Sequence, residues 1–520
     1  MTRRALALAA VAAGCSSSPK GPPPITFSKG FLWSVSTAAQ QSEGNLTTTD
    51  WYVFEGMGRV PPVGLADDMY DLYDEDFATA QSLGCNAFRL TFEWARFFPK
   101  APADPAHPTA AEMDPGAVAH YQAVLASLAK HGLTPLVTLT HYTLPIWVDD
   151  PAAYDGGVNA FTDGSLGGWI SPQTAVAFGA FAGLMAQQYG SQVKYWMTEN
   201  EPEVDLIGGY LAGILPPGLQ DLSLTAPMLP GNVSLSDVLQ NMIAGHADAY
   251  HAIHAAEPDA QVSLAHNTVA FTPVTQNVAN VQAAQRVQTL YDHVYLDAVT
   301  SGNFDTSLVG AGPNVAHADW ASTLDWIGVN YYTQDAVVAQ DNFLSPVNAV
   351  PCDPSFEQGL PGLLQGLGCP AAPLPEAPGF TSVLLDYTQR YHLPILVTEN
   401  GAGQGTGTDM ASYLVRNILA MHDAMDAGAN VIGYSYWTLN RDYEWAHGYD
   451  QDYGLYAVQG FELPYPDGGL PPLPDGGEWC PSAATDETRV PLSPAPEVYA
   501  AIIDAGITPA LLAEYPPDGG

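Results

Sequence analysis

Eight short segments rich in branched and aromatic residues recur along the chain, and amphipathic helix patterns separate them. The strand-like segments are 31–36, 87–92, 134–140, 194–198, 261–265, 324–330, 394–398 and 431–437. Apolar residues three or four apart predict helices at 71–83, 116–131, 174–189, 236–256, 282–299 and 410–427. Eight strands that alternate with helices predict an α/β fold of the closed (β/α)8 TIM barrel type.

Two stretches rich in proline and glycine, at about 336–379 and 461–491, interrupt this pattern. Neither has a core pattern of its own, so both are predicted to be long loop insertions on one barrel domain. No Gly-x-Gly-x-x-Gly motif follows a strand-like segment, which excludes a dinucleotide site of that type. The predicted domain covers residues 27–510, and 511–520 is a C-terminal tail.

The chain is strongly acidic. It has 15 Lys and Arg against 55 Asp and Glu, which gives a formal net charge of −40. Such a surface repels phosphate, so we expect neither a nucleic-acid partner nor binding to an anionic membrane surface. The charge suits a protein that acts on neutral ligands, and it does not identify the ligand.

The N-terminus has the features of an export signal. Residues 2–4 are basic, residues 5–13 are apolar but too short to span a bilayer, and small residues lead into Cys15. This resembles a bacterial lipoprotein signal, with 1–14 removed, Cys15 carrying the lipid and 15–26 forming a tether. We expect an exported protein, anchored by that lipid in the periplasm or outer membrane. The alternative is a cleaved signal peptide with an incidental cysteine, and then secretion.

Four further cysteines would lie in an oxidising compartment. Cys85 is predicted to be a buried free thiol. Cys352 and Cys369 bracket a loop rich in proline and glycine and are the favoured disulfide pair, with Cys480 as the competing partner. No pair of cysteines has zinc-site spacing with histidines, so no metal site is predicted.

Two strand-like segments end in carboxylates. Segment 395–401 reads Ile-Leu-Val-Thr-Glu-Asn-Gly and places Glu399 at its strand end. Segment 195–202 reads Tyr-Trp-Met-Thr-Glu-Asn-Glu-Pro and contains Glu199 and Glu201. A lone glutamate in such a place is usually a solvated loop acid. The repeated Thr-Glu-Asn at two strand ends favours a functional pair, because a barrel gathers its strand ends at one mouth.

The strand-like segments also have other polar or aromatic residues at or just after their ends. These residues are Gln41 and Glu43, Arg89, His141, Asn200, His266 and Asn267, Asn330, Tyr331 and Tyr332, and the run from Trp437 to Trp445. Two carboxylates that face each other across such a mouth can cleave an acetal, one as nucleophile and the other as proton donor. An arginine such as Arg89 and a tyrosine hydroxyl would keep the nucleophile ionised.

Five ordered motifs carry a family resemblance. They are 31–44, 198–202, 325–333, 397–401 and 437–445. Together they are similar to the motifs of family 1 glycoside hydrolases, the β-glucosidase and β-galactosidase group, and the likeness runs from about residue 27 to about residue 505. The resemblance implies a retaining exo-β-glycosidase that hydrolyses β-linked glycosides and needs no cofactor.

The resemblance also implies roles for the matched residues. Glu399 would be the nucleophile and Glu201 the general acid/base, with Tyr332 bonded to Glu399 and Arg89 supporting the base of the site. The sugar would be bound by Asn200 at its 2-hydroxyl, by Gln41, His141, Glu444 and Trp445 at its other hydroxyls, and by Trp437 as a stacking floor. Amide and carboxylate groups suit paired hydroxyls, and an indole suits the apolar face of a pyranose. Glu444 would repel a sugar 6-phosphate.

Several residues depart from the family pattern. They are Gln40, Met69, Tyr142, Glu199, Arg441 and Asp442. Tyr142 stands where the family has a tryptophan beside the sugar, which leaves the natural sugar open. Glu199 either acts on Glu201 by like-charge repulsion or points behind the strand toward a basic or hydroxyl group.

Two alternatives stay open at this point. The enzyme could transfer the sugar to another hydroxyl instead of water, and the sequence does not separate the two reactions. A surface lipoprotein that binds sugar without cleaving it is the other class, and retention of both Glu201 and Glu399 argues against it. The oligomeric state is not predicted.

Overall fold

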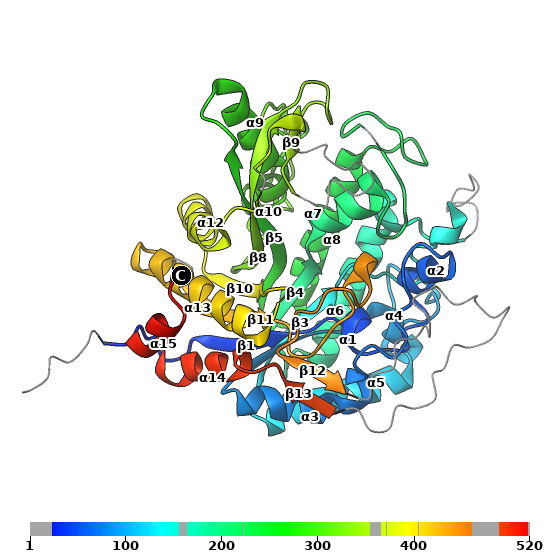
Figure 1. Ribbon diagram of the computed structural model, residues 1–520. Helices are drawn as coiled ribbons and strands as arrows, with labels where there is room; N and C mark the ends of the chain where they lie inside the picture. Colours follow the sequence, from blue (N-terminus) through cyan, green and yellow to red (C-terminus); the bar gives the residue numbers. More distant parts are fainter. Residues whose placement is uncertain are drawn as a thin grey trace, which may run out of the picture.

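The computed structural model describes residues 23–154, 164–221, 223–353, 366–370, 372–403, 405–459 and 488–517. Eight parallel strands form a closed barrel at its centre (Figure 1). They are β1 (Leu32–Ser36), β2 (Ala87–Thr91), β3 (Thr134–Thr140), β4 (Tyr195–Asn200), β5 (Gln261–Pro273), β8 (Ile327–Ala339), β10 (Ile395–Asn400) and β11 (Val431–Trp437). The first strand pairs with β11, and β8 pairs with β10, which completes the ring. The predicted (β/α)8 barrel is confirmed.

The barrel interior at the N-terminal ends of the strands is apolar. One buried cluster there consists of Ala87, Leu136, Met197, Ala265, Trp326 and Leu396. A much larger cluster lies between the strands and the helices that surround them. Because parallel strands carry helices outside and side chains inside, both faces of each strand are buried, which explains the near-continuous apolar runs in the sequence.

Helices surround the barrel, and short helices lie in loops that follow its strands. They are α1 (Ala39–Ser42), α2 (Asp50–Gly56), α3 (Met69–Ser82), α4 (Trp94–Phe97), α5 (Pro115–Lys130), α6 (Pro172–Tyr189), α7 (Pro202–Asp205), α8 (Leu235–Ala256), α9 (Val278–Gln288), α10 (Val294–Ser301), α12 (Glu376–Tyr391), α13 (Gly407–Asp426), α14 (Ala495–Ala505) and α15 (Pro509–Glu514). Short 3-10 and π turns are η1 (Ala110–Glu112), η2 (Pro151–Ala153), η5 (Gly168–Ile170), η6 (Leu206–Ala212), η7 (Thr289–His293) and η9 (Trp445–His447). The single helix predicted at 282–299 is broken by the π turn η7.

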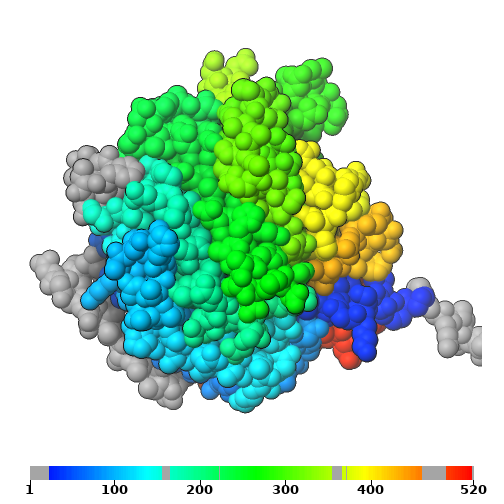
Figure 2. All heavy atoms as spheres, turned by 180° about the vertical axis from the view of Figure 1, so that it is seen from behind, coloured from blue at the N-terminus to red at the C-terminus, as the bar shows by residue number. Residues whose placement is uncertain are grey.

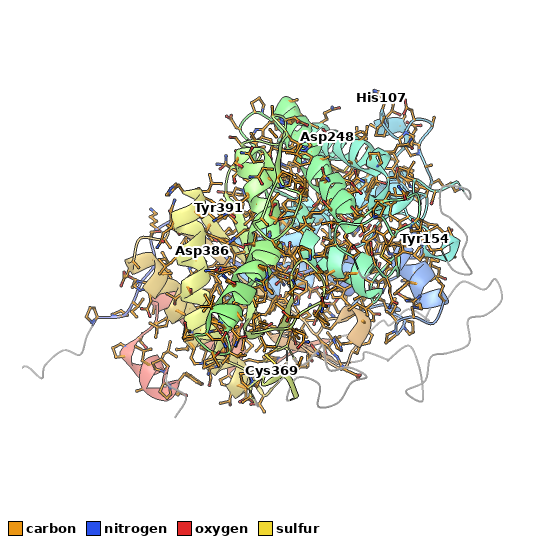
Figure 3. All side chains as sticks on the ribbon, turned by 90° about the horizontal axis from the view of Figure 1, so that it is seen from above. His107, Tyr154, Asp248, Cys369, Asp386 and Tyr391 are labelled. Carbon is orange, nitrogen blue, oxygen red and sulfur yellow. A yellow bond between two sulfur atoms is a disulfide. The ribbon has the colours of Figure 1, made fainter. Side chains whose placement is uncertain are left out.

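Helix α12 was not predicted, because a proline and a glycine near its start place it at the edge of an apparent loop. Polar contacts join it to η7 and to α10. His293 lies 2.8 Å from Asp386, and the Tyr391 hydroxyl donates to Asp297 at 3.1 Å. Figure 3 shows Asp386 and Tyr391 on this helix, at the outside of the molecule.

An arm extends beyond the barrel on two of its strands. Strands β5 and β8 each run for 13 residues, and their pairing continues as far as Pro273 opposite Val337. Strand β9 (Ala349–Pro351) adds antiparallel to β8, and α9 packs beside them (Figure 1). Figure 2 shows this arm, in green and yellow-green, at the top of the molecule. The insertion predicted at 336–379 is therefore part strand, part loop and part helix.

A disulfide lies beside this arm. Cys352 and Cys369 are joined, which is the pair that the sequence favours, and Cys85 is a buried free cysteine as expected. Cys480 lies outside the described residues, as does most of the insertion predicted at 461–491. The described end of that insertion is β13 (Thr488–Pro491), which pairs with β12 (Tyr456–Gln459). Two further short strands, β6 (Asn303–Asp305) and β7 (Asn314–Ala316), pair with each other.

The two ends of the predicted domain are packed together. Ile25, two residues before the predicted start of the domain, pairs with Ile507 in an antiparallel bridge. Helix α15 crosses the predicted boundary at 510, and the Tyr515 ring is buried. The predicted signal peptide and Cys15 lie outside the described residues. In the described part of the chain, no helix has the length and apolar character to cross a membrane.

Gly401 shows how closely two strand ends approach at the barrel mouth. A Cβ atom on this glycine would lie 1.9 Å from the Trp437 carbonyl oxygen. Backbone cannot move aside as a flexible side chain can, so only glycine fits between the ends of β10 and β11.

We therefore expect Gly401→Ala to lower the free energy of unfolding by about 1–3 kcal/mol, because the added methyl group overpacks a rigid contact. Urea unfolding followed by circular dichroism measures the change. Gly366→Ala is the matched control, since nothing lies within 4 Å of its Cβ position. Equal stability of the two variants would contradict this account.

Candidate active site

Glu399 is the penultimate residue of β10, lies inside the barrel mouth and is buried. One of its oxygens forms an ion pair with Arg89, and the other accepts a hydrogen bond of 2.6 Å from the Tyr332 hydroxyl. Burial raises the pKa of Glu399 to about 7, although the Arg89 charge opposes the shift, and the charge of Glu201 adds to it. Glu399 is thus a carboxylate that two donors orient from both sides.

Glu201 follows β4 and precedes Pro202, the first residue of α7. Its backbone is in the left-handed region, with a φ of 46°, a conformation that is uncommon outside glycine and is often found at functional sites. Its Oε1 accepts from the side-chain amides of Asn330 at 2.7 Å and Asn267 at 3.0 Å. Its Oε2 accepts from the Tyr142 hydroxyl. Both carboxylate oxygens are therefore occupied by donors.

Arg89 and Asn330 connect these two acids. Besides its ion pair with Glu399, Arg89 donates to Oδ1 of Asn200 at 2.6 Å. Asn330 donates both to that same Oδ1, at 3.1 Å, and to Glu201. Its own Oδ1 accepts from the Thr398 hydroxyl at 2.6 Å. The two carboxylates, from strands far apart in sequence, are thus held in one polar network.

The tripeptide Thr-Glu-Asn is repeated at both strand ends but turned differently. In β10 the glutamate, Glu399, faces the barrel interior. Both strands have a register shift at this place, between Met197 and Asn200 in β4 and between Val397 and Asn400 in β10. In β4 it is Asn200 that contacts Arg89, and Glu199 does not face inward. Glu199 lies behind the strand, where the Tyr295 hydroxyl donates to it at 2.8 Å. The second of the two predicted placements of Glu199 is the one observed.

His141 stacks against two indole rings. Its ring centroid lies 5.7 Å from that of Trp437 and 5.7 Å from that of Trp445. Burial, and then the Arg89 charge, lower the pKa of His141 well below its ordinary value, so the ring is neutral. Its Nε2 accepts from the Asn200 amide at 3.0 Å, which leaves the proton on Nδ1. Among the described residues, this Nδ1 has no hydrogen-bond partner.

Gln41 lies beside a pair of acids on the loop after β11. Its Nε2 donates to the Tyr443 carbonyl at 2.8 Å and lies 3.3 Å from Asp442 and 3.4 Å from Glu444. The Trp437 indole also donates to Asp442, at 3.1 Å. Burial, and then the Asp452 charge, raise the pKa of Asp442 to about 7. The pKa of Glu444 is raised as well, by burial and then by the charge of Asp442.

Other predicted strand-end residues point elsewhere. Glu43 forms an ion pair with Arg96 at 2.6 Å, and the Tyr331 hydroxyl donates to the carbonyl of Glu376. His266 is buried behind the strands, 3.5 Å from Glu203. In the described ranges, no group of three or more His, Cys, Asp or Glu is placed to hold a metal ion.

Sequence reasoning gave no role to three residues that contact the acids. Asn267 and Asn330 were recognised as strand-end residues, and Tyr142 only as a departure from the family. Their position at or just after the end of a strand-like segment is the sequence feature that indicates a place near the site. Which of their atoms meets which carboxylate oxygen depends on strand register and backbone turns that the sequence does not display.

A comparison with protein families identifies the chain's relationship. Residues 24–463 match the model of glycosyl hydrolase family 1. The chain belongs to this family. It is therefore a glycosidase, as the five motifs predicted, and its barrel is the expected scaffold for such an enzyme.

Named relatives of this family 1 enzyme include two kinds of glycosidase. A β-galactosidase from Pyrococcus woesei is 29% identical over 83% of this chain and 92% of its own length. β-Glucosidase 47 from Arabidopsis thaliana is 30% identical over 83% of this chain and 81% of its own length. A solved β-glycosidase from Pyrococcus horikoshii is 25% identical, covers 95% of this chain and 98% of its own, and superposes with a TM-score of 0.73.

Several acids with raised pKa values make the stability of the fold depend on pH. Burial raises the pKa of Glu93 and Asp335 to about 7 and that of Asp68 to about 6, as it does for Glu399 and Asp442. These carboxyls titrate near pH 4 in an unfolded chain, so between pH 4 and 7 the folded chain binds more protons. The contribution of these carboxyls to the free energy of unfolding therefore falls as the pH rises through this window. Histidines whose pKa values are lowered act in the opposite direction, but the carboxyls with a raised pKa outnumber them in the described part of the chain. These histidines are His120, His141, His246 and His266.

We expect a lower thermal midpoint at pH 8 than at pH 5, measured by calorimetry at constant ionic strength. One fully buried group such as Glu93 contributes a decline of roughly 3 kcal/mol. Glu93→Gln keeps an acceptor oxygen for its neighbours and removes that titration, so its midpoint should fall less between the two pH values. A midpoint that rises with pH would contradict the prediction.

Proposed function

We propose that this chain is a retaining exo-β-glycosidase that hydrolyses β-linked glycosides by double displacement. Glu399 acts as nucleophile and Glu201 as general acid/base. The observation that carries this proposal is the pair of buried carboxylates at the ends of β4 and β10, joined through Arg89, Asn200 and Asn330. A paired nucleophile and proton donor on facing strand ends is what a two-step acetal cleavage requires.

In the first step, the Glu399 carboxylate forms a bond to the anomeric carbon while the bond from that carbon to the leaving oxygen breaks. Glu201 gives its proton to that oxygen, so the aglycone leaves as a neutral alcohol. Arg89 and Tyr332 both donate to Glu399 and hold its attacking oxygen in a fixed direction.

In the second step, Glu201 is a carboxylate and removes a proton from water. The water oxygen bonds to the anomeric carbon as the bond to Glu399 breaks. The sugar is released with its original configuration, Glu201 is protonated again, and the Glu399 carboxylate is restored.

Free polar atoms near these acids support recognition of sugar hydroxyls. Nδ1 of His141 is a donor without a partner, and Oε1 of Gln41 is an acceptor without one, among the described residues. We assign Asn200, which accepts from Arg89 and Asn330, to the 2-hydroxyl, Glu444 and Trp445 to other hydroxyls, and the Trp437 ring to the stacking floor. The relatives' names point to glucose or galactose as the glycone.

A panel of aryl β-glycosides tests the proposal directly. Glucosides, galactosides, fucosides and mannosides are incubated with the protein, and release of the phenol is followed by absorbance. A glycosidase releases phenol from at least one member of the panel. A protein that binds sugar without cleaving it releases none, and that result would refute the proposed function.

The roles of the two acids are separated by azide. We expect Glu399→Gly to lose at least about 10³-fold in hydrolysis and, with azide, to form an α-glycosyl azide, because azide attacks from the vacated nucleophile side. Glu201→Gly should form the β-glycosyl azide, because azide attacks the glycosyl-enzyme from the opposite face. NMR of the products assigns the anomers, and exchanged anomers would reverse the roles.

We further propose that the protein is exported and anchored by a lipid on Cys15, which rests on the N-terminal sequence. Expressed at full length in a Gram-negative host, the wild type should sediment with membranes and dissolve in detergent. Cys15→Ser should move to the soluble fraction, whereas the control Cys85→Ser should stay with the membranes. A wild type found in the soluble fraction would favour the ordinary signal peptide.

A further inference from the structure

Tyr142 occupies an unusual place beside the proposed acid/base. It follows β3 with a left-handed backbone, at a φ of 67°, and it is buried. Its ring packs edge-on against Trp445, with centroids 4.7 Å apart, and its hydroxyl donates to Oε2 of Glu201. The backbone turn and the ring contact aim the hydroxyl at this one oxygen.

The other oxygen of Glu201, Oε1, faces N–H groups, which donate hydrogen bonds and cannot accept them. Asn330 and Asn267 both present NH2 groups to Oε1. Their orientation is fixed, because the Asn330 oxygen accepts from Thr398 at 2.6 Å and the Asn267 oxygen accepts from Tyr291 at 3.1 Å. A proton on Oε1 would meet two N–H groups, so the transferable proton of Glu201 belongs on Oε2.

A phenol is suited to an oxygen that gains and loses a proton. Its O–H donates to the carboxylate, and its oxygen accepts from the protonated acid after rotation of the same hydroxyl. The tryptophan that the family has at this position can only donate. Burial, and then the Glu201 charge, raise the pKa of Tyr142 well above its ordinary value, so the phenol keeps its own proton.

We propose that Tyr142 is a positioning residue for proton transfer, holding Oε2 of Glu201 in both of its protonation states and directing its proton toward the leaving oxygen. This inference rests on the proposed function and deepens it. Tyr142 forms no bond to the reacting atoms in this scheme. Its effect should therefore be confined to the proton transfer that Glu201 performs.

The leaving group provides the test. A phenyl glycoside needs its leaving oxygen protonated. From a 2,4-dinitrophenyl glycoside, 2,4-dinitrophenolate leaves as a stable anion and needs no proton. The value of kcat/KM reports the first step, in which the leaving group departs. We expect Tyr142→Phe to lower kcat/KM for the phenyl glycoside by a factor about tenfold or more larger than the factor for the dinitrophenyl glycoside. Both glycosides carry the sugar that the enzyme hydrolyses in the panel of aryl β-glycosides.

Tyr332→Phe is the matched control, because it removes the same hydroxyl from the other carboxylate, Glu399. This variant should lower kcat/KM for both leaving groups by similar factors. A double variant, Tyr142→Phe with Glu201→Gln, should be no slower on the phenyl glycoside than Glu201→Gln alone. Thermal midpoints of all the variants show whether each one is folded.

Two results would overturn the inference. In one, Tyr142→Phe lowers kcat/KM equally for both leaving groups, which is the behaviour of a sugar-binding or structural residue. In the other, it lowers activity by the same factor in the Glu201→Gln background. A wild type that releases neither phenol would overturn the proposed function itself, and this inference with it.

Discussion

The buried guanidinium of Arg89 is the interaction on which the barrel mouth depends. It lies inside the barrel, fully buried, and donates to Thr138, to Asn200 and to Glu399. A buried charge without such partners would be strongly destabilising, and removal of one partner typically costs about 3–5 kcal/mol. Three strands beyond its own are therefore tied to one planar group, and Glu399 is fixed by the same bonds that keep Arg89 satisfied.

Around this centre the chain uses backbone irregularities to aim side chains. Register shifts lie near the ends of both β4 and β10, where Glu199 meets Tyr295 and Asn200 and Glu399 meet Arg89. Residues with a left-handed backbone follow two of the strands, Tyr142 after β3 and Glu201 after β4. Regular strands alternate strictly between two faces, so they could not present neighbouring residues to one site. The irregular mouth costs local backbone strain, and the regular barrel below it supports that strain.

The general fold and the two acids were predictable because their signals are local or regular. Strand and helix periodicity predicted the eight barrel strands. Strand-end position predicted a facing pair of carboxylates that includes Glu399, and the family resemblance selected Glu201 as its partner. The arm on β5 and β8 and the helix α12 were missed, since proline and glycine there read as loop. The interruption of 282–299 by a π turn leaves the apolar periodicity intact, and it too was not predicted.

The sequence by itself determined the barrel, the family and the residues from which a site is built, because these follow from periodicity and from short motifs. Only the tertiary structure decided which atoms meet. Glu199 and Glu399 occupy the same position in two copies of Thr-Glu-Asn. Glu199 nevertheless contacts Tyr295 behind the sheet, whereas Glu399 contacts Arg89 inside the barrel. Tyr142, a simple departure in the sequence, reaches the second carboxylate. Such contacts depend on strand register and backbone turns, which long-range packing sets and local sequence does not encode.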